Sequence, residues 1–197
     1  MIDNALGAPW KLAPPPPQTR FIMPKIIGIT GLAGSGKSTI ADILEYDFGF
    51  VRVKMAGPLK AMLRAIGMSD VHIEGELKHS EQPMLCGKTP RHAMQTLGTE
   101  WGRKCIGENF WTGLFTEAAC DVIDNVGKVV CDDVRFANEA DTIRRIGGMI
   151  WGVTRPGVAS GKHESETGIA EIEPDHVIVN GGTIEDLQDA VWGLVLR

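Results

Sequence analysis

The sequence lacks the features that would assign it to several broad classes of protein. Its formal net charge is −5 over 197 residues, whereas binding along a nucleic-acid backbone normally needs a basic face. No apolar run approaches the ~20 residues that a membrane-spanning helix requires, and the N-terminus does not show the charged-then-apolar order of a secretory signal. We therefore expect a cytoplasmic protein that binds neither nucleic acid nor membranes. A local cluster of Arg and Lys can still hold the phosphates of a nucleotide inside an acidic protein.

Cysteine is scarce, and its spacing indicates neither a zinc site nor a disulfide framework. The four cysteines form no C-x-x-C pair: Cys86, Cys105, Cys120 and Cys131. Reduced thiols in a cytoplasm are the simplest interpretation. Cys131 lies in an apolar run, so we expect it to be a small core residue.

Proline is concentrated near the start of the chain. Pro14 to Pro17 form a four-proline run, which favours an extended, solvated backbone. We expect residues 1–23 to be a disordered leader, with a partner-binding segment as the alternative. Residues 24–197 are long enough for one domain with a substantial core.

After the leader, apolar patterns predict strands and helices in alternation. The predicted strands are residues 25–30, 50–54, 129–133, 149–154 and 176–180. The predicted helices are residues 38–48, 59–66, 91–103, 108–126, 138–146 and 183–196. This alternation implies a three-layer α/β/α fold with a mainly parallel central sheet. Residues 68–126 show no convincing long strand, so we expect a helical insert there.

The turn between the first strand and the first helix carries the most informative motif. Residues 31–38 read Gly-Leu-Ala-Gly-Ser-Gly-Lys-Ser and fit G-x-x-x-x-G-K-[ST], the phosphate-binding P-loop. Its glycines let successive N–H groups point at phosphates, and the positive end of the following helix faces the same anion. Lys37 is expected to reach the β- and γ-phosphates, and the Ser38 hydroxyl can ligate Mg²⁺.

A second strand supplies carboxylates for the same site. The predicted strand at residues 129–133 ends in Asp132 and Asp133, and a carboxylate at this position in a P-loop protein can hold Mg²⁺. Strand alternation does not decide which of the two serves the metal. We favour Asp132, because Asp133 adjoins Val134 and Arg135 and can instead orient the arginine.

The motifs that are missing narrow the class of P-loop protein. The sequence contains neither the N-K-x-D motif of GTPases nor the L-S-G-G-Q signature of transporter ATPases. A small chain with a helical insert is typical of a small-molecule kinase, in which arginines bind the acceptor and stabilise the transferred group. An acceptor monophosphate is mostly dianionic near pH 7, because its second pKa is about 6. Catalysis then needs positioning and electrostatics rather than a general base.

Several further segments carry a more specific pattern. They are Thr-Pro-Arg at 89–91, Gln-Thr-Leu-Gly-Thr-Glu-Trp-Gly-Arg at 95–103, Asn-Phe-Trp at 109–111, Asp-Val-Arg-Phe at 133–136, Asn-Glu-Ala at 138–140, His-Glu-Ser-Glu at 163–166 and Asn-Gly-Gly-Thr at 180–183. With them, the sequence from residue 25 to the C-terminus resembles the phage-type deoxynucleoside monophosphate kinases. The doubled acid at Asp132 and Asp133 departs from the single acid expected before Val-Arg-Phe.

The resemblance implies Mg-ATP as donor, a 2′-deoxynucleoside 5′-monophosphate as acceptor, and the diphosphate as product. It also implies a homodimer, in the host cytoplasm if the protein is phage-encoded. The residues implied to bind the donor are Gly31, Ala33, Gly34, Ser35, Gly36, Lys37, Ser38, Thr39, Asn180 and Gly181. The residues implied to bind the acceptor are Lys54, Arg91, Glu100, Trp101, Arg103 and Arg135. The catalytic set is Lys37, Asp132, Asp133 and Arg135, with Ser38 and Asp132 as metal ligands.

Two alternatives remain open at this point. A dephospho-coenzyme A kinase-like enzyme shares the P-loop and the final Asn-Gly turn, but it does not explain residues 89–103. A regulatory module that binds ATP without transferring its phosphate is the alternative from a different class. The polar segment at residues 155–172 is either a lid over the phosphates or an ordinary loop.

Overall fold

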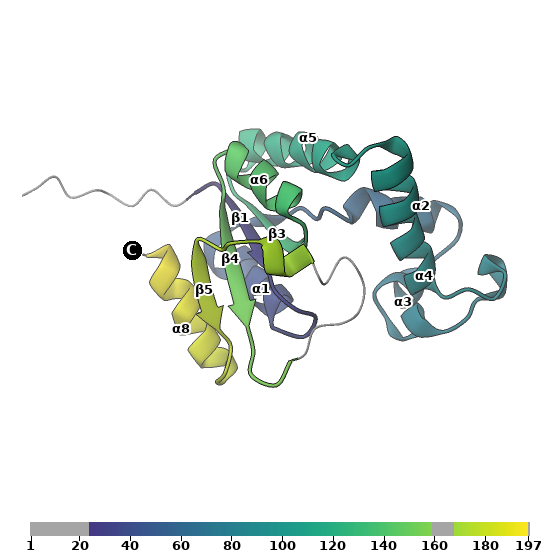
Figure 1. The fold of residues 1–197 in the computed structure, drawn as a ribbon. Coiled ribbons are helices and arrows are strands. Elements are labelled where there is room, and N and C mark those ends of the chain that lie inside the picture. Colours follow the sequence, from purple (N-terminus) through teal and green to yellow (C-terminus); the bar gives the residue numbers. More distant parts are fainter. Residues whose placement is uncertain (1–23, 159–167, 197) are drawn as a thin grey trace, which may run out of the picture.

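A five-stranded parallel sheet forms the centre of the molecule (Figure 1). The computed structural model describes residues 24–158 and 168–196, so the predicted leader and the segment 163–166 lie outside the described residues. The strand order is β2-β3-β1-β4-β5. The strands are β1 (Ile26–Thr30), β2 (Val51–Arg52), β3 (Val129–Val134), β4 (Met149–Thr154) and β5 (His176–Val179). All five predicted strands are confirmed.

Helices cover both faces of this sheet, which confirms the predicted three-layer architecture. Helices α1 (Lys37–Phe48) and α8 (Ile184–Val195) pack on one face, in a core that includes Ile29, Val130 and Trp151. Helices α5 (Phe110–Asn125) and α6 (Ala137–Arg145) belong to the other face. Successive residues of a strand point to opposite faces of the sheet. Neighbouring residues of β3 therefore pack against different helical layers.

The second strand is shorter than the five residues predicted. Val53 still donates its N–H to the carbonyl of Val130 at 2.9 Å, but the ladder does not continue through Met55 and Ala56. The N–H groups of Met55 and Ala56 bond instead to the carboxylate of Asp133, at 2.9 and 3.0 Å. The chain therefore leaves the sheet at this point and enters a helix.

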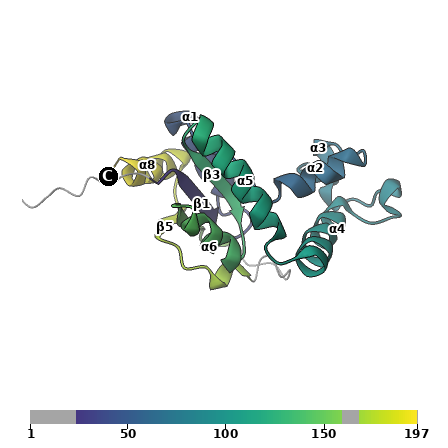
Figure 2. The ribbon, with the colours of Figure 1, turned by 90° about the horizontal axis from the view of Figure 1, so that it is seen from above.

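A second group of helices stands beside the sheet and has its own core (Figures 1 and 2). It contains α2 (Gly57–Ala65), α3 (Asp70–Ile73), the 3-10 turns η1 (Glu76–His79) and η2 (Pro83–Leu85), α4 (Pro90–Gln95) and the π-helix η3 (Thr96–Ile106). Its core joins Leu59 and Leu63 of α2 to Ile73 and Trp111. Helix α5 connects this core to the sheet, because Trp111 packs in the insert whereas Phe115 packs on β3. The helical group thus starts at α2, before residue 68, and ends within α5.

The helix predicted at residues 91–103 consists of two different helices. Regular α4 ends at Gln95, and the chain continues as a π-helix, a form that is rare and often found at functional sites. The widened helix seats Trp111, whose indole N–H donates to the carbonyl of Gly98 at 2.8 Å. A Cβ added at Gly102 would lie only 2.3 Å from the Trp111 indole nitrogen. Glycine at 102 is therefore what lets the two helices approach.

Candidate active site

The P-loop bends tightly between β1 and α1, as the motif predicts. Gly31, Gly34 and Gly36 have positive φ values of 147°, 79° and 106°, a region that side chains other than glycine rarely occupy. A Cβ at Gly31 would lie 2.4 Å from the carbonyl oxygen of Val153, and one at Gly36 would lie 2.3 Å from the amide of Asn180. Both the turn and its surroundings require glycine there.

The side chains of the loop occupy positions suited to a polyphosphate. The Lys37 ammonium donates to the carbonyls of Gly31 and Leu32, both at 2.7 Å, and so lies over the loop. Ser38 lies exposed in the first turn of α1. Ala33, Gly34 and Thr39 are exposed or half-buried around the same turn, whereas Ser35 is buried.

Asn180 braces the P-loop from the end of β5. Its buried side-chain amide donates to the carbonyl of Ser35 at 2.9 Å. The resemblance places Asn180 near the donor base, and the structure places its amide against the loop itself. The neighbouring Gly181 lies beside Pro156, since a Cβ at Gly181 would be 3.7 Å from that proline ring.

The two adjacent aspartates at the end of β3 face different parts of the molecule. Val130 belongs to the core on the α1 side of the sheet, and Cys131 belongs to the core on the α5 side. By strand alternation Asp132 shares the α1 side with the P-loop helix, whereas Asp133 shares the side of Cys131. Asp133 lines the pocket described below. The two adjacent carboxylates therefore lie in two separate sites, Asp132 on the side of α1 and Asp133 at the cavity.

Asp132 is buried against two cations. One carboxylate oxygen, Oδ2, accepts from Arg52 at 3.3 Å, and Oδ1 lies 3.5 Å from the Lys54 ammonium. Arg52 also pairs with Asp42 and Glu45 of α1, at 2.6 and 2.5 Å. Oδ1 is buried and accepts no hydrogen bond, since the lysine contact is too long for one. A buried, under-coordinated carboxylate oxygen suits Mg²⁺, which prefers oxygen ligands.

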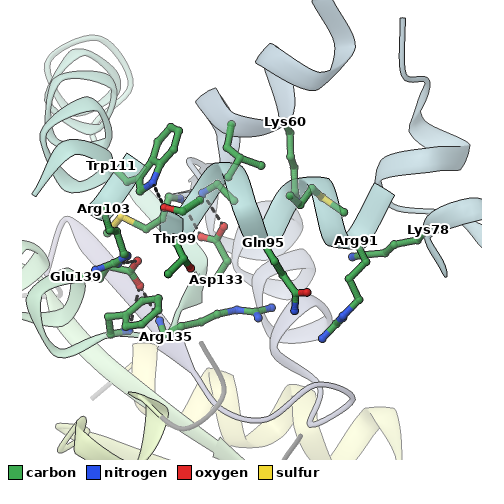
Figure 3. A pocket seen from close by; sticks show the side chains of 16 residues that line it. Lys60, Lys78, Arg91, Gln95, Thr99, Arg103, Trp111, Asp133, Arg135 and Glu139 are labelled. Atoms are coloured by element: carbon green, nitrogen blue, oxygen red, sulfur yellow. Dashed lines mark hydrogen bonds and ion pairs between the residues drawn. The ribbon is translucent and has the colours of Figure 1, made fainter. Parts of the chain in front are cut away.

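A cavity of about 190 Å³ opens between the end of β3 and the helical insert (Figure 3). Its apolar wall is formed by Met55, Leu59, Met94, Trp111 and Phe136. The basic side chains that line it are Lys60, Lys78, Arg91, Arg103 and Arg135. Its two carboxylates are already engaged, because Asp133 accepts backbone N–H groups and Glu139 binds Arg103. The cavity is therefore cationic inside an acidic protein, and an apolar wall beside cations fits an anion that carries a flat ring.

A buried ion pair forms part of the lining of the cavity. Arg103 donates to Glu139 at 2.6 Å and to the side-chain oxygen of Asn138 at 3.1 Å, and its guanidinium stacks 3.7 Å from the centre of the Phe136 ring. Glu139 also accepts the backbone N–H groups of Arg135 and Phe136, at 2.7 and 3.2 Å. Burial raises the pKa of Glu139 to about 7, although its hydrogen bonds and the charge of Arg103 act in the opposite direction. The pair fixes the geometry of the turn that carries Arg135.

Of the six residues implied for the acceptor, three line this cavity: Arg91, Arg103 and Arg135. Lys54 contacts Asp132 instead. Glu100 pairs with Lys104 on the outer surface at 3.0 Å, and Trp101 packs against Phe110 and Trp111 and lines a separate shallow groove. The structure therefore separates Glu100 and Trp101 from the cationic cavity.

Five polar residues line the cavity that the sequence analysis did not assign: Lys60, Lys78, Gln95, Thr99 and Glu139. Helical spacing from Arg91 could have identified Gln95 and Thr99, which follow it at successive intervals of four residues. The sequence carries no comparable signal for Lys78, because this residue lies in an irregular connection whose path depends on the rest of the fold.

Within the described residues, no helix is long and apolar enough to cross a membrane, and no cluster of three or more His, Cys, Asp or Glu forms a metal site.

Comparisons with the sequences of known proteins agree on one family. A model of the deoxynucleotide monophosphate kinase family matches residues 86–191. A putative deoxynucleotide monophosphate kinase of Acanthamoeba polyphaga mimivirus is 35% identical over 184 residues, which cover 86% of this chain and 95% of that protein. The deoxynucleotide monophosphate kinase of Enterobacteria phage T4 is 25% identical, covering 83% of this chain and 95% of its own. That of Escherichia phage RB69 is 33% identical over 106 residues, covering 51% of this chain and 42% of its own. The chain thus belongs to the deoxynucleotide monophosphate kinase family and is a nucleotide kinase.

Proposed function

We propose that the chain transfers the γ-phosphoryl group of Mg-ATP to a 2′-deoxynucleoside 5′-monophosphate, and that the resulting diphosphate feeds DNA precursor supply. The observation that carries this proposal is the position of the cationic cavity. It opens at the carboxyl end of β3, the strand hydrogen-bonded to the P-loop strand β1. Donor and acceptor phosphates would meet at this shared edge of the sheet.

The transfer itself needs little covalent assistance from the protein. An oxygen of the acceptor phosphate forms a bond to the γ-phosphorus as the bond to the β–γ bridging oxygen breaks, and ADP leaves. Because the acceptor is already dianionic near neutral pH, no side chain has to remove a proton. The protein must instead align the two phosphates and balance the charge that develops between them.

The described residues divide this task between them. Lys37 would release its contacts with Gly31 and Leu32 to bind the β- and γ-phosphates. The backbone N–H groups of the loop would bind the other oxygens of the triphosphate. Arg135 lines the cavity directly after β3, where it can stabilise the group in transit. Mg²⁺, held by the Ser38 hydroxyl and the Asp132 carboxylate, would neutralise charge on the β- and γ-phosphates.

The test is acceptor-dependent release of ADP from Mg-ATP. The acceptor panel contains the deoxynucleoside and ribonucleoside monophosphates, and dephospho-coenzyme A tests the alternative kinase. We expect stimulation by one or more deoxynucleotides, and a loss of turnover of about 10²–10⁴-fold in Lys37→Ala, because this removes a charge that stabilises the transferred group. A response to dephospho-coenzyme A alone, or ATP binding with no response to any acceptor, would overturn the proposal.

A further inference from the structure

One of the cations of the cavity comes from the irregular segment between α3 and α4. Lys78 lies in η1, a single 3-10 turn between α3 and α4. Its side chain is half-buried and lines the cavity. Among the described residues, none forms a hydrogen bond or a salt bridge with the Lys78 ammonium, whereas nearby Lys60 and Glu74 bind each other. A half-buried ammonium that makes no hydrogen bond to the described residues is available to an anionic ligand.

Lys78 lies close to two other cations of the cavity. Arg91, at the start of α4, and Arg135, after β3, line the same cavity. Figure 3 shows Lys78, Arg91 and Gln95 on the insert side, with the Arg135 side chain extending from the sheet side toward Gln95. We call Lys78, Arg91 and Arg135 the cation cluster.

The electrostatics of Lys78 agree with this geometry. Burial lowers its pKa, and the positive charges of Lys60, Arg91 and Arg135 lower it further, while Glu74 acts in the opposite direction. Glu74 is the one carboxylate among these influences, and it is already paired with Lys60. The repulsion that Lys78 experiences from its basic neighbours is therefore only partly offset by Glu74, and a dianion placed beside Lys78 would relieve it.

We propose that Lys78 binds the phosphate of the acceptor nucleotide, opposite Arg135, and so links the helical insert to the sheet through the substrate. This inference rests on the proposed function, because it deepens the assignment of the acceptor site. The phosphate lies between Lys78 and Arg91 on one side and Arg135 on the other. The rest of the nucleotide extends along the apolar wall toward Trp111.

The experiment compares ligands with and without the phosphate. Calorimetry measures the affinity of the wild type for each of dAMP, dCMP, dGMP and dTMP, and for the phosphate-free nucleoside that matches the tightest of them. Lys78→Met should weaken nucleotide binding by about 10- to 100-fold, the loss expected for one charge-assisted hydrogen bond, and should leave nucleoside binding unchanged. Lys78→Arg should restore most of the affinity, and Lys88→Met, which removes an exposed lysine of the same insert, should have no effect.

The pH dependence gives a second readout that a purely structural role would not change. Because the pKa of Lys78 is lowered in the empty protein, nucleotide affinity should fall as pH rises through that lowered value, and Lys78→Arg should remove this fall. In kinetics, Lys78→Met should raise the acceptor KM while the KM for ATP stays constant.

Each failure has a separate meaning. An equal loss of nucleoside and nucleotide affinity in Lys78→Met, or no loss of either, would overturn the role of Lys78. If the wild type binds nucleotides through Lys78 but releases no ADP, the phosphate site stands and the proposed transfer is wrong.

Discussion

At the scale of residues, the adjacent Asp132 and Asp133 perform different tasks despite being neighbours. Asp132 is buried between Arg52 and Lys54 on the side of α1, whereas Asp133 accepts the N–H groups that begin α2. Sequence alternation showed that the two must point apart, but it could not show which side holds the P-loop helix. The positions of α1 and the insert supply that information.

Exchanging each aspartate for asparagine should separate these tasks. Asp132→Asn should lower kcat by about 10²-fold and raise the Mg²⁺ concentration needed for half-maximal activity, because it removes a charged oxygen ligand. Asp133→Asn should instead lower the free energy of unfolding by about 1–3 kcal/mol, since one amide oxygen cannot replace both carboxylate acceptors, and should raise the acceptor KM. A Mg²⁺ titration and urea unfolding of both variants make the comparison. A larger metal effect in Asp133→Asn would reverse the assignment.

Glu139 should make stability depend on pH. Burial raises its pKa from 4.5 to about 7, so between these values the folded state retains a proton that the unfolded state has released. The free energy of unfolding should therefore fall as pH rises through this window, by on the order of 1–3 kcal/mol from this group. The glutamine side chain of the Glu139→Gln variant cannot titrate. The free energy of unfolding of this variant, measured by urea unfolding, should therefore change less between pH 5 and 8 than that of the wild type.

Glu117→Gln is the matched control for this measurement. Glu117 is exposed on α5, so its replacement should leave the pH profile of the wild type unchanged. An identical pH profile for Glu139→Gln and the wild type would show that Glu139 does not titrate in this window.

At the scale of elements, regular periodicity predicted the strands and most helices, and it failed where packing overrides it. Residues 91–103 have the spacing of one α-helix, yet the chain becomes a π-helix after Gln95. The cause is tertiary, because Trp111 of the next helix inserts against Gly102 and bonds the carbonyl of Gly98. No local pattern at residues 96–106 reports the position of a tryptophan on another helix.

A methyl group at Gly102 should disrupt this packing. Gly102→Ala would bring a Cβ to within 2.3 Å of the Trp111 indole, and such overpacking costs about 1–3 kcal/mol of unfolding free energy. Because the same helix carries Thr99 into the cavity, the acceptor KM should rise as well.

Gly113→Ala is the control within α5, where an added Cβ meets no atom within 4 Å of the described structure. It should stabilise the protein by about 0.5–1 kcal/mol, the usual gain for alanine over glycine inside a helix. Urea unfolding measures both variants. Equal stabilities would show that the helices can separate at no cost, contrary to the packing described.

At the scale of the whole molecule, charge is distributed in a way that composition cannot reveal. The chain is acidic, with a net charge of −5, yet the cavity collects cations from α2, η1, α4, η3 and the end of β3. The P-loop, the carboxylate strand and several arginines could be identified from sequence, because each belongs to a local motif. The cation cluster could not, since Lys78 and Arg135 are far apart along the chain and only the fold brings them to one cavity.

The hydrogen bond from Asn180 to Ser35 can form only late in synthesis of the chain. The two residues are 145 positions apart, so a nascent chain emerging from the ribosome presents its glycine loop long before the brace for that loop has been synthesised. The loop gains this hydrogen bond only after β5, the next to last of the elements, has been synthesised. We therefore expect a truncated translation product that ends before residue 180 to bind ATP more weakly than the full chain, because it lacks this hydrogen bond to the loop.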